Sequence, residues 1–193
     1  MQHLNMGAVM ENPRRQRMGR DEFRQWAEQQ EGARYERVDG EPVAMAPERA
    51  IHARIKARVW QALDRTLRDH GGDCEALPDG MTVEIDADTD YEPDAVVNCG
   101  PPIPDDAVAA TNPVIVVEVL SPGTKGVDTG AKLDGYFRVP GIVHYLIVLT
   151  ARRGVIHHRR AHDGGIDTRI LSSGKIELDP PGIAIDIDEI YGR

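Results

Sequence analysis

The sequence predicts a single α/β layer domain, built from hairpins, a long helix, central strands, one crossover helix and further strands. Its 193 residues are enough to bury a core in one domain. Hairpin signals and apolar runs of strand length alternate with two segments of helical periodicity, and no internal repeat or interdomain linker separates them. Residues 1–18 lack hydrophobic periodicity and are expected to form a flexible tail, which leaves 19–193 as the domain.

The N-terminal elements are a short helix and a hairpin. Phe23, Trp26 and Ala27 form an apolar stripe that predicts a helix over 21–31, with Asp21 as its N-cap. Residues 34–38 and 41–46 then flank the dipeptide Asp39-Gly40. This dipeptide predicts a tight hairpin, because both turn positions need positive φ.

The longest helix is predicted over 48–70 and ends at Gly71-Gly72. Apolar residues recur every four positions along it, at Ile51, Ile55, Val59, Leu63 and Leu67. The other face carries cations, namely Arg49, Arg54, Lys56, Arg58, Arg65 and Arg68. A solvated polar face explains these charges most simply, and a surface for a phosphate backbone is the alternative.

Strands dominate the remainder of the chain. The run 113–120 is the most hydrophobic and predicts a central buried strand, and 143–149 predicts another. A crossover helix is predicted between them over 128–138. Shorter strands are predicted at 82–86, 94–98, 155–158, 168–171 and 175–178.

The charge distribution is uneven. The net charge is −9, yet residues 69–124 hold 13 Asp or Glu and no Lys or Arg. The chain is therefore a mildly basic body with an acidic middle. Its net charge alone does not exclude a nucleic-acid partner, although it predicts weak and salt-sensitive nonspecific binding.

Composition also excludes several classes of protein. No apolar run approaches the ~20 residues of a membrane helix, and the N-terminus has no apolar core of a secretory signal. No membrane partner and a cytoplasmic location are therefore expected. The cysteines, Cys74 and Cys99, are expected to be reduced thiols. Gly-rich phosphate loops and Cys-x-x-Cys motifs are absent from the sequence.

Polar residues occupy positions where a core pattern predicts apolar ones. Asp94 opens a strand, and Glu118 interrupts the apolar run 114–120. Lys132 follows in the crossover helix, on one face with Asp128 and Tyr136. Carboxylates at adjacent strand ends suit Mg²⁺, and a lysine beside them could orient a water or stabilise charge on a phosphate. A structural ion pair between Glu118 and a cation is an equally weighted alternative.

The same residues form part of an ordered motif string that resembles the Uma2 (Uma-two) family of restriction endonucleases. The resemblance covers about residues 18–160 and includes His52. The motifs are Tyr35-Glu36-Arg37-Val38-Asp39-Gly40-Glu41, Pro93-Asp94-Ala95-Val96-Val97, Val117-Glu118-Val119-Leu120-Ser121-Pro122-Gly123-Thr124, Asp128 with Lys132 and Tyr136, and Gly141-Ile142-Val143-His144-Tyr145. In the last motif the family favours an acidic residue and then Tyr-Trp, where this chain has His144-Tyr145-Leu146.

The resemblance implies a restriction-endonuclease-like fold of the PD-(D/E)XK nuclease superfamily. The core of that fold is a mixed four-stranded β-sheet flanked by helices, to which this chain is expected to add β-hairpins and strands. The superfamily pattern is Asp, then Glu-x-Lys, and Leu120 occupies the lysine position here. As in the family, the lysine is expected in the next helix, as Lys132. Asp94 and Glu118, with the Val119 carbonyl, would then hold Mg²⁺ or Mn²⁺ for hydrolysis of phosphodiester bonds, in DNA rather than RNA. The alternative is a non-catalytic interaction or scaffold protein that keeps the nuclease fold.

Other polar residues have two interpretations each. Glu36 and Glu41 flank the hairpin turn and could complete the metal site or be surface charges. His52 could contact a phosphate or a metal-bound water, or could cap or pack the helix. Asp128 is expected to be an N-cap or a partner of Lys132, rather than a ligand.

A histidine-rich segment follows the second central strand, at His157-His158-Arg159-Arg160 and His162. Adjacent residues of a strand face opposite ways, so the neighbouring histidines cannot readily chelate one zinc ion. We therefore expect this segment to be a surface patch. Nucleases that cut both strands are commonly dimeric. A homodimer is therefore one expected state, although no interface can be identified in the sequence.

Overall fold

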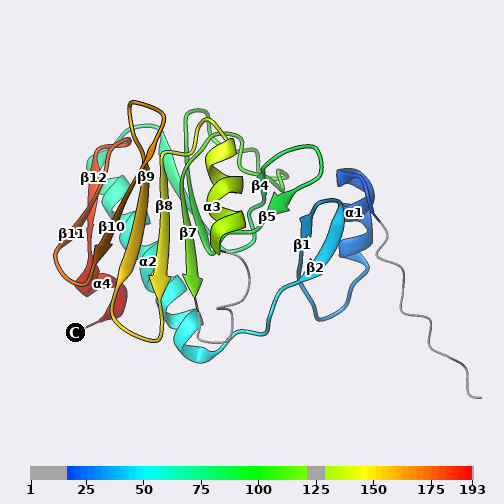
Figure 1. The fold of residues 1–193 in the computed structure, drawn as a ribbon, viewed down its shortest axis with the longest axis horizontal. Coiled ribbons are helices and arrows are strands. Elements are labelled where there is room, and N and C mark those ends of the chain that lie inside the picture. The colour runs from blue at the N-terminus through cyan, green and yellow to red at the C-terminus, as the bar shows by residue number, and fades with distance from the viewer. Residues whose placement is uncertain (1–16, 121–128, 193) are drawn as a thin grey trace, which may run out of the picture.

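The computed structural model describes residues 17–120 and 129–192. Its centre is a six-stranded mixed sheet in the order β10-β9-β8-β7-β6-β3 (Figure 1). The β7–β8 pair is parallel, and the other neighbours are antiparallel. The strands are β3 (Cys74–Pro78), β6 (Ala95–Cys99), β7 (Pro113–Leu120), β8 (His144–Leu149), β9 (Val155–Arg160) and β10 (Ile166–Leu171).

Helices α2 (Ala50–His70) and α3 (Thr129–Arg138) cover opposite faces of this sheet. Alternation along β7 explains the arrangement, since successive side chains point to opposite faces. Val117 packs in the cluster that contains the apolar stripe of α2, and Val116 packs in the cluster that contains Tyr136 of α3. The predicted mixed sheet flanked by helices is confirmed.

A smaller sheet, in the order β2-β1-β5-β4, lies beside the N-terminal helix. Its strands are β1 (Tyr35–Val38), β2 (Glu41–Ala44), β4 (Val83–Glu84) and β5 (Asp90–Tyr91). Asp39 and Gly40 adopt φ of 52° and 79°, as the predicted turn requires. Helix α1 spans Arg20–Glu28 with Gly19 as its N-cap, so the prediction of Asp21 at the cap is wrong and Asp21 lies in the first turn.

The C-terminal segment forms β11 (Lys175–Leu178), β12 (Ile183–Asp186) and α4 (Ile187–Tyr191), which pack on α2. The sequence did not predict β12, α4, β3 or β5. These elements have two to five residues, too few to show a period. Packing against long-range neighbours, rather than local pattern, stabilises them.

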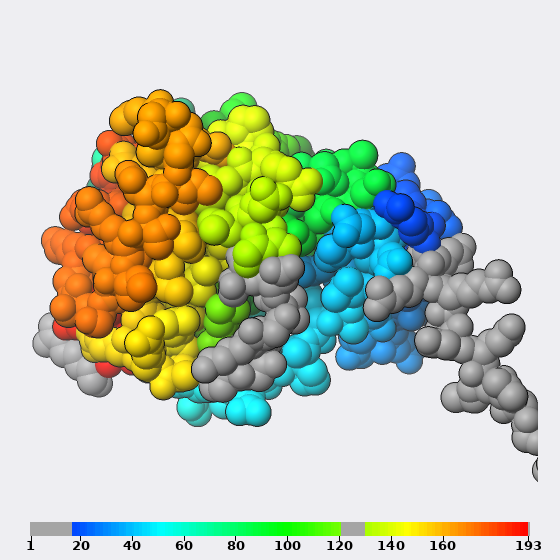
Figure 2. All heavy atoms as spheres, in the orientation of Figure 1, coloured from blue at the N-terminus to red at the C-terminus, as the bar shows by residue number. Residues whose placement is uncertain are grey.

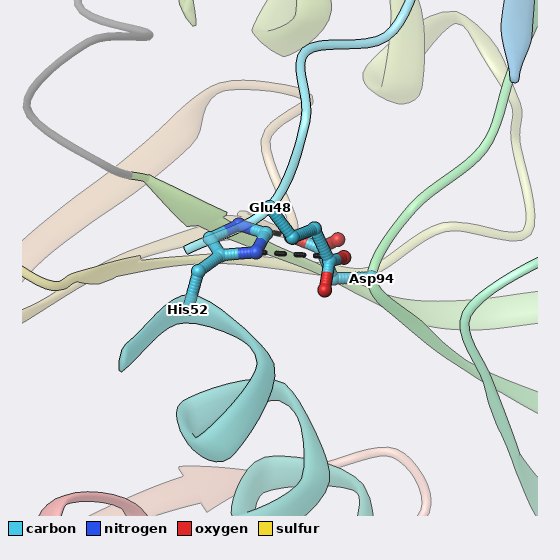
Figure 3. A group of neighbouring side chains, drawn as sticks. All are labelled: Glu48, His52 and Asp94. Atoms are coloured by element: carbon cyan, nitrogen blue, oxygen red, sulfur yellow. Dashed lines mark ion pairs between the residues drawn. The ribbon is translucent and has the colours of Figure 1, made fainter. Parts of the chain in front are cut away.

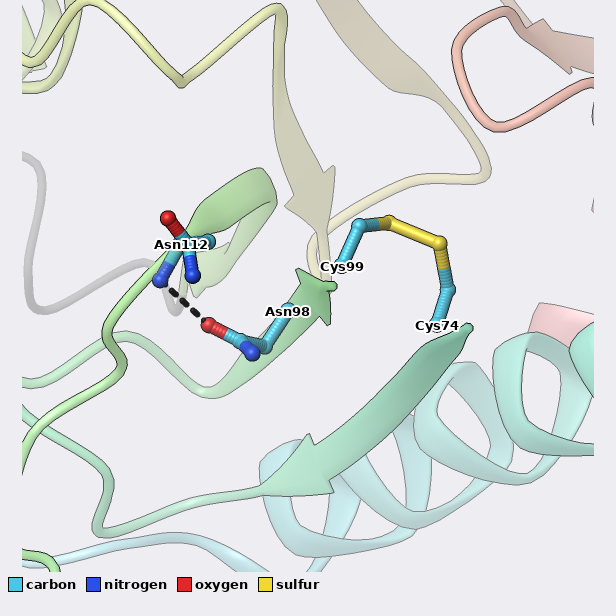
Figure 4. The surroundings of a disulfide bond; sticks show 4 residues. All are labelled: Cys74, Asn98, Cys99 and Asn112. Atoms are coloured by element: carbon cyan, nitrogen blue, oxygen red, sulfur yellow. Dashed lines mark hydrogen bonds between the residues drawn. A yellow bond between two sulfur atoms is a disulfide. The ribbon is translucent and has the colours of Figure 1, made fainter. Parts of the chain in front are cut away.

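The two cysteines form a disulfide, so the expectation of reduced thiols is wrong (Figure 4). Strand β3 pairs with β6 in a register that sets Cys74 directly opposite Cys99, with the Cα atoms 4.0 Å apart. No sequence pattern places the two cysteines together, because the sequence does not predict β3. Disulfides persist mainly in oxidising compartments, so this bond does not favour the expected cytoplasmic location.

In the histidine-rich strand β9, His157 and His158 are buried and Arg159 and Arg160 are half-buried, so the expectation of a surface patch is wrong for these residues, whereas His162 is exposed. His157 Nε2 lies 2.9 Å from Nδ1 of His144, and burial lowers the pKa of both rings to about 4. His158 faces the other way, stacks on Tyr145 and lies 2.8 Å from the Thr168 hydroxyl. The opposite orientation of the two rings agrees with the alternation of a strand.

The cationic face of α2 separates into three groups. Lys56 is buried and forms ion pairs, so the expectation that it belongs to a solvated face is wrong. Arg58, Arg65 and Arg68 bind the Tyr191 carbonyl, Glu189 and Asp64, respectively. Arg49 and Arg54 are exposed and form no ion pair within the described residues.

The apolar stripe of α2 differs from the prediction at its first residue. Ile51, predicted in the stripe, is 43% exposed.

The remaining expectations concern the tail and the membrane. Met18 is buried and its amide donates to the Gly40 carbonyl, which ties the start of the described chain to the hairpin. Residues 1–16 of the predicted tail lie outside the described residues, and the division at 18/19 stays a prediction. Among the described helices, none is long and apolar enough to cross a membrane.

Candidate functional site

The candidate site lies where β6 begins and β7 ends. Antiparallel pairing of Ala95 with Val117 brings the preceding Asp94 next to Glu118. Both carboxylates line a cavity of about 170 Å³. The other polar side chains that line it are Glu36, Glu48, His52, Lys132 and Tyr145. Residues from β1, α2, β7 and α3 therefore meet here, although they are far apart in the sequence.

Glu118 faces α3 and is held by two donors from that helix. Its Oε1 accepts from Lys132 Nζ at 2.8 Å and from the Tyr136 hydroxyl at 2.6 Å. Burial of Tyr136 raises the pKa of its hydroxyl well above the ordinary value, and the nearby Glu118 carboxylate raises it further. Tyr136 is therefore neutral at physiological pH and remains a hydrogen-bond donor.

Glu36 of β1 is the second carboxylate bound by Lys132, at 2.7 Å. Its Oε1 also accepts from the Glu92 amide. Burial raises the pKa of Glu36, whereas Lys132 opposes this shift. Burial alone would lower the pKa of Lys132, but Glu118 and Glu36 outweigh it and the pKa is raised. Lys132 is thus a fixed positive charge between two acidic groups.

Asp94 faces α2. Its Oδ2 accepts from the Val119 amide at 2.6 Å, and its Oδ1 lies 3.0 Å from Lys56 Nζ. Burial and the Glu118 carboxylate raise the pKa of Asp94 to about 6, against the opposing effect of Lys56. Lys56 also binds Glu48 and Asp79, so three carboxylates surround this ammonium.

Glu48, His52 and Asp94 form a group whose ligand atoms all lie within 4.8 Å of one another (Figure 3). His52 Nε2 is in hydrogen-bond contact with the Val119 carbonyl, so we assign the ring proton to Nε2. Nδ1 is buried, has no hydrogen-bond partner within the described residues and lies 3.6 Å from Glu48. A histidine that donates one ring N–H to a backbone carbonyl and keeps the other nitrogen free has the arrangement of a metal ligand.

The predicted site residues are mostly brought together. The structure places Asp94, Glu118, Lys132, Glu36 and His52 around one cavity. Tyr136 supports Glu118 from behind, and Glu41 is not among the lining residues. Asp128 lies outside the described residues. The Leu120 side chain lines the cavity without any charge, which agrees with the lysine having moved to the helix.

Sequence reasoning missed Lys56, Glu48 and Asp79. The sequence pattern places Lys56 on a polar helix face, because charged residues surround it in the chain. One signal could have singled it out: the chain has only four lysines against 19 arginines. Two of the four, Lys56 and Lys132, are ion-paired with the carboxylates of this site.

Comparison with known proteins identifies the family of this chain. The family model described as "Uma2: Putative restriction endonuclease" matches residues 20–187, which is most of the chain. The chain belongs to the Uma2 family. It is also 32% identical over 175 residues to the "Uncharacterized protein slr1290" of Synechocystis sp. (strain ATCC 27184 / PCC 6803 / Kazusa), an alignment covering 89% of this chain and 90% of that protein.

A solved structure shows that this Uma2 chain shares its fold with another protein. It is a crystal structure from Anabaena variabilis ATCC 29413, described as "a putative nuclease belonging to DUF820". The TM-score is 0.68, and the match covers 89% of this chain and 96% of the other. Sequence identity is 14%, so the likeness establishes the fold alone.

Proposed function

We propose that this Uma2 protein is a metal-dependent nuclease that hydrolyses phosphodiester bonds in DNA. The observation that carries the proposal is the convergence of Asp94, Glu118 and Lys132 on one cavity. A core ion pair would need only one carboxylate for one lysine. Here four acidic side chains line the cavity, Glu36, Glu48, Asp94 and Glu118. Two lysines pair with them, Lys132 from the cavity lining and Lys56 from behind Glu48 and Asp94, so the acids still outnumber the cations.

The donor set fits a divalent cation. Carboxylate oxygens are the ligands that Mg²⁺ and Mn²⁺ prefer, and an imidazole nitrogen is acceptable to Mn²⁺. Asp94 and Glu118 would hold the ion. Glu48, two residues before α2, and the unpaired Nδ1 of His52, in the first turn of α2, would complete the set beside Asp94. A bound divalent ion would polarise the scissile phosphate and lower the pKa of a water. The Val119 carbonyl contacts His52 and would orient that ring.

Lys132 acts as a charge rather than as a base. Its raised pKa keeps the ammonium protonated at physiological pH, so it cannot accept a proton from water. It can donate hydrogen bonds to a water or to a phosphate oxygen as negative charge develops in the transition state. Glu36 and Glu118 hold the ammonium in place for this role.

The substrate class rests on the fold and on the cations near the cavity. Arg49 and Arg54, on the first turns of α2, are exposed and form no ion pair with other described residues. Arg49 directly follows Glu48, and Arg54 lies two residues after His52. Because Glu48 and His52 line the cavity, the two arginines are placed to contact phosphates on either side of a bound strand. The preference for DNA over RNA comes from the family description, which names a restriction endonuclease.

Cleavage assays test the proposal. Purified full-length protein is incubated with supercoiled DNA, single-stranded DNA and RNA, with Mg²⁺, Mn²⁺ or a chelator. We expect metal-dependent cleavage of DNA that falls by about 10²–10³-fold in Asp94→Asn and Glu118→Gln. Asp105→Asn, which changes an exposed acid that lines none of the cavities described, is the matched control and should keep full activity.

Thermal unfolding separates the nuclease from its alternative, a scaffold that keeps the fold. Mn²⁺ at about 100 times its Kd should stabilise the wild type by about 2.7 kcal/mol and leave Asp94→Asn unchanged. A metal-dependent shift without cleavage of any substrate would favour a non-catalytic metal-binding protein. Absence of both effects would reject the metal site and the nuclease together.

A further inference from the structure

Strand β10 is an open edge of the central sheet. It pairs with β9 on one side, and no described segment pairs with its other side. Residues 166–170 are all exposed, including Ile166 at 43% and Ile170 at 68%. The hairpin that carries them forms the orange surface in Figure 2. Soluble proteins usually protect such an edge with Pro, charged side chains or a bulge. Strand β10 has no Pro and no bulge, and its two charged residues, Asp167 and Arg169, are of opposite sign.

The ladder with β9 shows which backbone groups of β10 face outward. The Arg160 amide donates to Val143, on the β8 side, and the Ala161 amide donates to Gly165, on the β10 side. Alternation along an antiparallel pair then turns the amides and carbonyls of Asp167 and Arg169 toward β9. Those of Ile166, Thr168 and Ile170 point to the open edge.

The side chains of this edge are complementary to themselves. In an antiparallel pair of two β10 strands centred on Thr168, Ile166 lies opposite Ile170 of the second copy, and Asp167 lies opposite its Arg169. The isoleucines share one face and the charged pairs share the other. Neither Asp167 nor Arg169 forms an ion pair within the described chain, so both are available to a partner. Opposite-charge and β-branched cross-strand pairs stabilise a sheet.

We propose that β10 pairs with β10 of a second copy of this chain, about a two-fold axis through Thr168, and joins the two central sheets. The backbone permits a centre at Thr168, because its outward amide and carbonyl can form a hydrogen-bonded pair with those of Thr168 in the second copy. This self-complementary arrangement matches the isologous interface of a two-fold dimer. The proposal does not depend on nuclease activity, since its test measures association.

The first test is a charge reversal. Sedimentation or light scattering of the full chain, from micromolar to near-millimolar concentration, should show a monomer–dimer equilibrium. Asp167→Arg and Arg169→Asp each place like charges opposite one another twice per dimer, and each should weaken association by about tenfold or more. The double variant, Asp167→Arg with Arg169→Asp, exchanges the charges and should restore the dimer.

The second test blocks the backbone. Thr168→Pro removes an amide that faces outward and keeps the backbone ladder with β9, but it also loses the hydroxyl that lies 2.8 Å from His158. It should give a folded monomer, whereas Thr168→Val, which loses the hydroxyl and keeps the amide, should remain a dimer. Ile170→Lys should also weaken the dimer, whereas Val108→Lys, at a site 52% exposed outside the central sheet, should not. Circular dichroism and unfolding curves check that each variant remains folded.

Three results would overturn the proposal. One is a wild type that stays monomeric throughout the concentration range. Another is a dimer that persists in both single reversals and in Thr168→Pro, which would place the interface elsewhere. The last is a double variant no better than the single ones, which would reject the register centred on Thr168.

Discussion

Two lysines divide the candidate site into halves of different character. Lys132, from α3, binds Glu36 and Glu118, whose side chains are only 8% and 10% exposed. Lys56, from α2, binds Asp94, which is similarly buried, but also Glu48 and Asp79, which are 38% and 27% exposed. We call the first the closed half, because both of its carboxylates are buried, and the second the open half, because two of its three carboxylates are partly open to water. The two lysine side chains themselves are similarly buried, at 15% exposed for Lys132 and 9% for Lys56.

The difference indicates separate roles for the two halves. Charges in the closed half depend on one another, because neither Glu36 nor Glu118 can be fully solvated if Lys132 is lost. In the open half, water can replace Lys56 at Glu48 and Asp79. The open half also contains His52, whose unpaired Nδ1 faces Glu48. We therefore expect a metal to enter from the α2 side, while the α3 side keeps the geometry.

The largest expected effect is on the free energy of unfolding, when each of the two lysines is replaced separately and one ion cluster is broken at a time. Lys132→Met should lower the free energy of unfolding by about 3–5 kcal/mol, because it leaves buried carboxylates without a cation. Lys56→Met should cost less, about 1–2 kcal/mol, since two of its three partners are partly solvated. Urea denaturation measures both. Lys175→Met, at an exposed position, is the control and should change stability by less than about 0.5 kcal/mol. Equal losses in the two site variants would contradict the division into halves.

A smaller effect concerns the tyrosine that supports Glu118. Tyr136→Phe removes the 2.6 Å hydrogen bond to a buried carboxylate and should cost about 1.5–3 kcal/mol in unfolding free energy. Tyr145→Phe is a matched control, because Tyr145 is equally buried but its hydroxyl makes no hydrogen bond within the described residues. If the two variants lost the same stability, the contact with Glu118 would not be the cause.

The smallest expected effect is the pH dependence of metal binding. The pKa of Asp94 is raised to about 6, so the carboxylate takes up a proton as the pH falls through 6. A metal needs the ionised form, and its apparent affinity should fall about tenfold, or about 1.4 kcal/mol, for each pH unit below that value.

The increase in Tm that Mn²⁺ causes reports the apparent affinity for the metal, and it is measured at pH 5 and at pH 7.5. The increase should be larger at pH 7.5. Lys56→Met removes a charge that lowers the pKa of Asp94, so it should move the transition to higher pH. A transition that does not move in Lys56→Met would show that another group controls binding.

Much of the site could be predicted from the sequence, because its carboxylates violate a clear pattern. Glu118 stands inside an apolar run and Asp94 opens a strand, so their unusual positions are visible locally. Lys132 was found through the family resemblance and its place on a helix face. Lys56 could not be found in this way, because it lies among other cations, and only the packing of α2 turns it toward Asp94.

The sequence by itself determined the strands and helices with strong periods, the hairpin at Asp39-Gly40 and the three residues proposed for chemistry. The tertiary structure alone decided the pairing of β3 with β6, and with it the bond between Cys74 and Cys99. It also decided which charges are buried. The physical reason is that a local period reports which face of an element is apolar, whereas the partner of a charged or sulfur-containing side chain depends on contacts between segments far apart in the chain.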